Sequence, residues 1–249
     1  MLKFDLEPDL FKLLENKKVA IVGPSPHLIG TGLGNKIDQY DLVCRVNEVH
    51  PTGYERDYGN KTDVVFHNCG TIHIPHFRNN LKKSPKVSKN LKYVICPCVK
   101  AVGSDTNWHT WSDEHISPVV LNFHSVNKYN TPFYWIGMKN YKFVYNNFFG
   151  VEPNAGQTAI VILLLHKVRE LFITGFSFYA QGNLPTLSIR PGHVEKAREN
   201  ELVGDAGHPQ SPQKNAFKNK IFKQYGEIIV VDSYLNDLLD LQHDRVVKL

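Results

Sequence analysis

The fold is decided by one stretch of the sequence, KKVAIVGPSPHLIGTGLGNKIDQYDLVCRVNEV, residues 17–49. Within it, VAIVG is a short apolar run that ends in glycine, as expected for a strand buried on both faces, and DLVCRVN is typical of a second strand. A turn rich in Gly and Pro lies between the two runs. Strands joined in this way commonly bind a nucleotide at the turn. The residues around the turn must therefore tell whether that nucleotide is a redox cofactor or the activated part of a transferred group.

The composition is that of an ordinary globular protein with 249 residues, 42% hydrophobic and 21% charged. The formal net charge of +5 suits an anionic ligand or an anionic membrane surface. No run of Lys and Arg is interleaved with aromatic residues, so we expect no nucleic-acid partner. No apolar segment reaches the roughly 18 residues of a membrane span, and the N-terminus lacks a signal-like apolar run. We therefore expect a cytoplasmic protein, with peripheral membrane contact left open.

The chain alternates strand-length apolar runs with helical segments, which predicts an α/β fold with a mostly parallel sheet covered on both faces. An amphipathic helix is expected over 1–17 and a long buried helix within 152–171. Further strands are expected in 61–68, 92–99, 117–124 and 171–179, and 228–239 predicts a strand followed by a short helix. Parallel sheets bind ligands beyond the carboxyl ends of their strands. This selects the helix start near Gly156 and the turns after Gly23, Asn47, His67 and Gly175.

The first turn does not fit a redox cofactor. The dinucleotide fingerprint needs G-x-G-x-x-G directly after the strand, but Pro24 and Pro26 occupy this turn. The second strand ends in RVN, without the acidic residue that would bind a ribose. The P-loop pattern is absent as well. A nicotinamide-dependent oxidoreductase is therefore disfavoured.

Three blocks of the sequence resemble the sialylmotifs of the eukaryotic sialyltransferase family, in the family's order. Residues 153–179, PNAGQTAIVILLLHKVRELFITGFSFY, resemble the small motif, and residues 207–215, GHPQSPQKN, resemble the very small motif. Residues 23–63 resemble the large motif, with matches at Gly23, Ser25, Leu28, Gly34, Ile37, Asp38, Asp41, Val43, Arg45, Asn47, Pro51, Thr52, Gly53, Glu55, Asp57, Gly59, Lys61 and Thr62.

The resemblance implies an inverting glycosyltransferase that moves sialic acid from CMP-sialic acid to a hydroxyl of a glycan or glycolipid, without a metal ion or other cofactor. It implies a single Rossmann-like, GT-A-like domain over 1–249, with the N-terminal helix at 1–17. Residues 19–68 would form the large-motif, donor-binding half. Residues 151–235 would form the half with the small motif and the catalytic histidine.

The matching positions give candidate site residues. His208 matches the histidine of the very small motif, and an imidazole suits a general base near neutral pH. Strand-end turns and helix N-termini present backbone N–H groups to a phosphate or a carboxylate. The expected donor-binding residues are Gly23, Ser25, Asn47, Asn154, Ala155 and Gly156.

Three departures from the family keep alternatives open. The strand VAIVG and the small-motif segment contain no cysteine, so the disulfide that joins these motifs in the animal enzymes is not expected. Asn154 and Ala155 stand where the family has hydroxyl residues, and CMP-Kdo is therefore an alternative donor. Gln213 stands where the family has a glutamate, so a catalytically inactive CMP-sugar-binding protein is a further alternative.

Several other residues have two interpretations. Tyr179 and His193 lie in the region expected to assist the departure of CMP, but each also fits an ordinary loop. The chain has 12 histidines, and we interpret the metal-like spacing of 67, 73 and 76 as chance and predict no metal site. Four cysteines, Cys44, Cys69, Cys96 and Cys98, lack zinc-site spacing and are expected to be buried thiols. The aromatic residues Trp108, Trp111, Tyr134 and Trp135 fit either a wall that stacks on sugars or a packed core.

Overall fold

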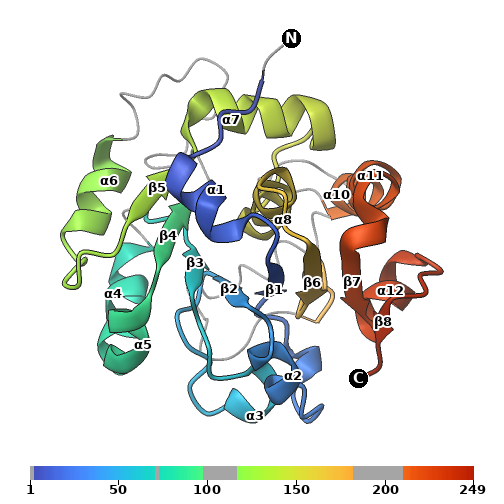
Figure 1. The fold of residues 1–249 in the computed structure, drawn as a ribbon, viewed down its shortest axis with the longest axis horizontal. Coiled ribbons are helices and arrows are strands. Elements are labelled where there is room, and N and C mark those ends of the chain that lie inside the picture. Colours follow the sequence, from blue (N-terminus) through green and yellow to red (C-terminus); the bar gives the residue numbers. More distant parts are fainter. Residues whose placement is uncertain (1–2, 71–72, 98–116, 182–209) are drawn as a thin grey trace.

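The computed structural model describes residues 3–70, 73–97, 117–181 and 210–249 (Figure 1). They form a single α/β domain around one eight-stranded sheet, in the order β5-β4-β3-β2-β1-β6-β7-β8, and every strand pair is parallel. The predicted fold class is confirmed. The strands are β1 Lys18–Val22, β2 Leu42–Val46, β3 Val64–Phe66, β4 Tyr93–Cys96, β5 Phe133–Trp135, β6 Glu170–Thr174, β7 Ile229–Asp232 and β8 Val246–Val247.

Helical segments connect the strands and cover both faces of the sheet. In Figure 1, α1 and α7 lie toward the top of the view and α2 and α3 toward the bottom. The segments are α1 Pro8–Leu14, η1 Pro26–Leu28, α2 Gly34–Asp38, α3 Glu55–Tyr58, α4 Ile74–Lys83, α5 Pro85–Asn90, α6 Ser117–His124, α7 Gly137–Val144, η4 Tyr145–Phe149, α8 Ala155–Leu165, α10 Gln210–Ala216, η7 Phe217–Phe222, α11 Lys223–Tyr225, η8 Gly226–Ile228 and α12 Ser233–Leu239.

The apolar run of β1 divides its side chains between two cores. Val19 and Ile21 join the larger core, together with the buried residues of α1 and α8. Ala20 and Val22 point to the opposite face and join the core under η1, α2 and α3. Successive side chains of a strand alternate between the faces of the sheet, so a strand covered on both sides needs apolar residues throughout. This explains why VAIVG carries no polar residue.

The expected strand over 117–124 is wrong, because this segment forms helix α6. Val119 and Phe123 are each 1% exposed whereas Leu121 is 67% exposed. A spacing of four between the buried residues is helical, and the apolar Leu121 on the outer face conceals it. Phe123 stacks on Phe133 of β5, with ring centroids 4.4 Å apart. The fifth strand thus lies in the aromatic stretch, for which the sequence predicted no regular structure.

The aromatic side chains of β5 pack against the main core. Tyr134 and Trp135 are half-buried there. This favours the packing interpretation for these two residues. Trp108 and Trp111 lie outside the described residues.

Several residues that match the large motif hold the backbone of the domain. Arg45 is 2% exposed, and its Nε donates to Thr62 Oγ1 at 2.9 Å. Its Nη2 donates to the carbonyls of Tyr58, Gly59 and Lys61 at 2.8, 3.1 and 2.9 Å. Burial lowers the pKa of the guanidinium to about 10. The Arg45 side chain therefore ties α3 and the loop after it to the edge of β2.

Two aspartates of the same motif act on neighbouring loops. Asp57 accepts the N–H groups of Gly30 and Gly32, at 2.9 and 2.7 Å. Asp38 accepts those of Asn60 and Lys61, at 2.8 and 2.9 Å. Backbone N–H groups in irregular loops need such partners when strands do not supply them. These matches therefore support the turns that precede and follow β2.

The described cysteines lie in the interior. Cys44, Cys69 and Cys96 are all buried, and Cys98 lies outside the described residues. Burial raises the pKa of the Cys44 thiol well above its usual value. Within the described ranges, no helix is long and apolar enough to cross a membrane.

Candidate functional site

The order in which the chain adds strands to the sheet reverses between β1 and β6. The chain runs outward from β1 to β5 on one side, returns through α8, and builds β6, β7 and β8 on the other side (Figure 1). The last residues of β1 and β6, Val22 and Thr174, are directly paired. The turns that follow these two strands therefore lie side by side. Ligands of open α/β sheets bind at such a switch point, beyond the carboxyl ends of the strands.

The two turns at the switch point are in backbone contact. The N–H of Gly23 donates to the Thr174 carbonyl at 2.8 Å, and that of Ser25 donates to the Gly175 carbonyl at 2.9 Å. A Cβ on Gly23 would lie 2.4 Å from the oxygen of Gly175, and a Cβ on Gly175 would lie 2.4 Å from that of Gly23. Gly175 also has a φ of +74°, which disfavours any side chain. The turn after β1 is thus fixed against β6 by two glycines.

These contacts change what the first turn can offer to a ligand. The sequence suggested that backbone N–H groups of Gly23–Ser25 would bind the phosphate, but those of Gly23 and Ser25 donate to β6 and its turn. Pro24 and Pro26 have no N–H group. Among the side chains of this turn, the Ser25 hydroxyl is the hydrogen-bond donor. Gly23 allows the backbone of Gly175 to lie close against this turn.

The N-terminus of α8 reaches the same edge of the sheet. Asn154 caps the helix, because its side-chain oxygen accepts the N–H of Gln157 at 2.9 Å. The following Ala155 and Gly156 contribute N–H groups of the first helical turn, which an α-helix leaves without intrahelical partners. Gly156 packs against Phe176, which follows β6: a Cβ on Gly156 would lie 2.7 Å from Phe176 Cε1. The structure therefore brings four of the predicted donor-binding positions, Gly23, Ser25, Asn154 and Gly156, to the turns around β6.

Asn47 lies at the carboxyl end of β2, next to β1. Its N–H donates to the Phe66 carbonyl at 2.8 Å, and its side chain is half-buried. Its φ is +62°, a left-handed conformation that Asn adopts more readily than most residues. The chain therefore turns sharply at Asn47, at the same edge of the sheet as Gly23.

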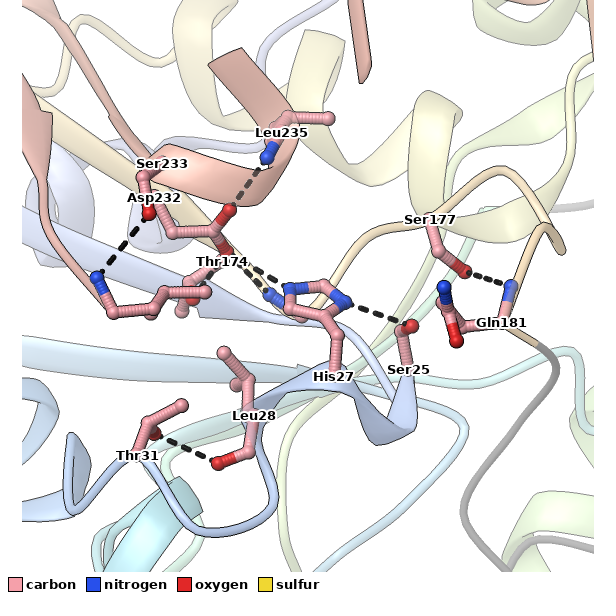
Figure 2. A network of polar contacts seen from close by, with 12 residues as sticks. Ser25, His27, Leu28, Thr31, Thr174, Ser177, Gln181, Asp232, Ser233 and Leu235 are labelled. Carbon is pink, nitrogen blue, oxygen red and sulfur yellow. Dashed lines mark hydrogen bonds and ion pairs between the residues drawn. The ribbon is translucent and has the colours of Figure 1, made fainter. Parts of the chain in front are cut away.

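A buried hydrogen-bond network joins the turn after β1 to β7 (Figure 2). Ser25 Oγ lies 2.9 Å from His27 Nδ1, and His27 Nε2 lies 3.2 Å from Asp232 Oδ2. The His27 ring stacks on Tyr234, with centroids 4.2 Å apart. Sequence reasoning missed both His27 and Asp232. The available signal was their place at the carboxyl ends of apolar strands: His27 lies in the turn after β1, and Asp232 is the last residue of β7.

The predicted base lies outside the described residues. His208 and His193 both fall within 182–209. Gln213, which stands where the family has a glutamate, is fully buried, and its Oε1 accepts the N–H of Asn154 at 3.0 Å. A glutamate carboxylate would offer the same acceptor. Tyr179 is half-buried and has a φ of 63°.

His67, the first of the three histidines that follow β3, lies in the core. His67 is fully buried, stacks on Phe77 at 4.3 Å, and its Nδ1 accepts the N–H of Cys69 at 3.0 Å. Burial lowers the pKa of His67 well below its usual value, and the neighbouring His73 and His76 lower it further. Among the described residues, no group of three or more His, Cys, Asp or Glu side chains is arranged to hold a metal ion.

The neutral state of His67 predicts a loss of stability in acid. Its pKa is depressed in the folded state, so below about pH 6.5 the unfolded chain binds the extra proton more readily. Stability is therefore complete above about pH 6.5 and falls with decreasing pH, by at most about 1.4 kcal/mol per pH unit for this group. We expect the melting temperature to fall by about 3 °C per unit from this residue.

Thermal unfolding between pH 7.5 and 5 tests this prediction. His67→Gln should be less stable at pH 7.5, because it loses the stacking on Phe77, but should lose less stability on acidification. His124→Gln, at an exposed histidine, is the control and should keep the decline of the native protein. An unchanged decline in His67→Gln would contradict the prediction.

Comparison with solved structures places the fold. Monofunctional alpha-2,3-sialyltransferase Cst-I from Campylobacter jejuni aligns with a TM-score of 0.51 at 13% identity, over 93% of this chain and 78% of that chain. CstII from Campylobacter jejuni, solved with cytidine-5'-monophosphate, aligns with a TM-score of 0.50 at 15% identity, over 87% and 80%. At these identities the likeness shows the fold alone.

Curated relatives are similar over part of their length. Beta-galactoside alpha-2,6-sialyltransferase 2 of Danio rerio is 26% identical over 154 residues, which is 60% of this chain and 29% of that protein. CMP-N-acetylneuraminate-beta-galactosamide-alpha-2,3-sialyltransferase 4 of Mus musculus is 35% identical over 74 residues, 29% of this chain and 22% of that protein. The chain thus spans less than a third of the length of these two relatives.

A family model covers more than half of the chain. The model of glycosyltransferase family 29 (sialyltransferase) matches residues 4–151. This region contains β1, β2 and the loops held by Arg45, Asp38 and Asp57, and it ends before α8. The chain belongs to glycosyltransferase family 29, the sialyltransferase family.

Proposed function

We propose that this protein is an inverting sialyltransferase, which moves sialic acid from CMP-sialic acid to a hydroxyl of a glycan or glycolipid. The observation that carries the proposal is the meeting of two motif segments at one edge of the sheet. The turn after β1 belongs to the large-motif half, and the N-terminus of α8 belongs to the small-motif half. Both pack against the turn that follows β6.

The donor carries a phosphate and a carboxylate, and the site offers groups that suit anions. The first turn of α8 presents backbone N–H groups at the positive end of the helix dipole. The Ser25 hydroxyl is a further hydrogen-bond donor, and Gly23 and Gly175 let the turns after β1 and β6 approach each other closely. Asn47 lies at the end of the neighbouring strand β2, and in this proposal its amide contacts the nucleotide. The reaction as proposed uses neither a metal ion nor an organic cofactor.

His208 supplies the general base in this proposal. The acceptor hydroxyl becomes a stronger nucleophile as its proton passes to the imidazole, and its oxygen attacks the anomeric carbon. CMP leaves from the opposite face, so the configuration at that carbon inverts. Gln213 holds the start of α8, since its side-chain oxygen accepts the N–H of Asn154. The family's glutamate offers the same acceptor oxygen, so glutamine at this position keeps the hydrogen bond to Asn154.

The donor is tested by CMP release from CMP-sialic acid and, separately, from CMP-Kdo over a panel of glycan acceptors. Acceptor-dependent release from CMP-sialic acid is the expected result. Release from CMP-Kdo alone would instead identify a Kdo transferase, consistent with Ala155 at a position where the family has a hydroxyl. CMP binding without release from either donor would identify a catalytically inactive CMP-sugar-binding protein.

A further inference from the structure

Three strand ends meet at Asp232. The residue is fully buried, at the last position of β7. Its Oδ2 accepts the Thr174 hydroxyl at 2.7 Å and the Gly175 N–H at 3.2 Å, both from the end of β6. Its Oδ1 accepts the N–H of Leu235 at 2.7 Å and so caps α12. His27 Nε2, from the turn after β1, lies 3.2 Å from Oδ2.

The surroundings of Asp232 fix one proton of His27. Every group around the carboxylate in this network is a hydrogen-bond donor, which suits the ionised form, and a carboxylate can only accept. His27 Nε2 therefore carries a hydrogen directed at Asp232. The remaining nitrogen, Nδ1, faces Ser25 Oγ (Figure 2). The hydrogen bonds are compatible with Nδ1 either carrying a proton or lacking one.

The state of Nδ1 decides where the Ser25 hydroxyl proton points. In neutral His27, Nδ1 accepts that proton. When His27 takes up a second proton, Nδ1 donates to Ser25 Oγ, and the hydroxyl proton must turn to another acceptor. The backbone groups of Ser25 are already engaged, since its N–H donates to Gly175 and its carbonyl accepts the Tyr58 hydroxyl at 2.5 Å. Only the hydroxyl can change partner.

Burial limits the number of acceptors that the Ser25 hydroxyl can reach. Ser25 is 2% exposed, so water competes poorly for its hydroxyl in the unliganded protein. An anionic oxygen bound at this glycine-lined turn would supply the alternative acceptor. Within the described ranges, the titratable groups that contact the network are Asp232 of β7, Tyr234 of α12 and Tyr58 of α3.

We propose that His27 is a positioning residue that couples donor binding to proton uptake: a phosphate at the turn after β1 accepts the Ser25 hydroxyl proton while His27 gains a proton from solvent. The proposal rests on the proposed function, because it requires a CMP-type phosphate at this turn. The balance is one proton taken from the buffer onto Nδ1 for each phosphate hydrogen bond formed. No covalent bond forms or breaks.

Calorimetric titration with CMP at pH 7.5, in buffers of different ionisation enthalpy, measures this proton uptake. The native protein should take up protons on binding CMP. Ser25→Ala should bind CMP roughly tenfold more weakly and take up none, as a charge-assisted hydrogen bond is lost. His27→Gln should behave in the same way, because the amide can still reach Asp232 but does not titrate.

The double variant and a second ligand separate this role from a structural one. If the two side chains act together, the double variant should bind CMP no more than about twofold more weakly than either single variant. Cytidine lacks the phosphate and should bind all four proteins alike. Additive losses, equal losses for cytidine, or CMP binding by the native protein without proton uptake would each overturn the proposal. Failure of the native protein to bind CMP would instead overturn the proposed function. If His27→Gln does not fold, Ser25→Ala and the native protein still decide the proton count.

Discussion

Replacing Gly175 with alanine is expected to lower the free energy of unfolding by more than about 3 kcal/mol and to remove CMP binding. Two effects combine at this residue. An L-residue at φ +74° adopts a left-handed backbone, which costs roughly 1–2 kcal/mol. In addition, the new Cβ would lie 2.4 Å from the backbone oxygen of Gly23, and a backbone atom cannot move aside as a flexible side chain can. Relief requires the turns after β1 and β6 to separate.

A second glycine isolates the contribution of the contact. Gly137 has the same φ of +74°, but a Cβ there would meet nothing within 4 Å. Gly137→Ala should therefore cost only the backbone term, roughly 1–2 kcal/mol, and should leave CMP affinity unchanged. Urea unfolding and calorimetric CMP titration of both variants provide the comparison. Equal losses of stability in the two variants would show that the turns are not in contact.

The sequence predicted the central strands and the buried helix well, because their burial leaves a simple pattern. β1 is covered on both faces, and its residues VAIV are an uninterrupted apolar run that ends at Gly23. β2 is apolar except for the buried Arg45, and the residues AIVILLL of α8 form an apolar run that ends at His166. The same simplicity misled at α6. There Leu121 is exposed on the outer face, so the apolar residues of SPVVLNFH do not follow a helical period although Asn122 and His124 are polar. Short strands such as β5 at the sheet edge carry too few residues for a pattern.

The candidate site was predictable only in part, for a different reason. Motif resemblance located Gly23, Asn47 and Gly156, and the parallel sheet then brings these positions to one edge. It gave no means to see that the backbone N–H groups of the first turn are engaged with β6. Nor could it connect His27 with Asp232, which lies 205 positions further along the chain. Hydrogen bonds between side chains from distant turns depend on the register of strands and not on any local pattern.

His208→Ala is expected to lower the rate of sialic acid transfer at least about a hundredfold, within the range of general-base catalysis. In the proposed mechanism the base acts on the acceptor hydroxyl, while CMP would contact the turns around β1, β6 and α8. CMP affinity should therefore stay within about twofold of the native value, since the substitution removes an interaction made chiefly in the transition state. Initial rates with a saturating acceptor, together with calorimetric CMP titration, measure the two quantities separately.

The exposed His124 on α6 provides the matched control, and His124→Ala should retain native transfer and native CMP affinity. The pH dependence gives a second criterion. In the native protein the acidic limb of kcat reports the group that must lose its proton to accept that of the acceptor, and this limb should vanish in His208→Ala. A variant that keeps both the native rate and the native limb would remove His208 as the base. His193 and Tyr179 would then be the next residues to replace. If the rate falls and CMP affinity falls equally, His208 contributes to donor binding, and the proton acceptor must be sought elsewhere.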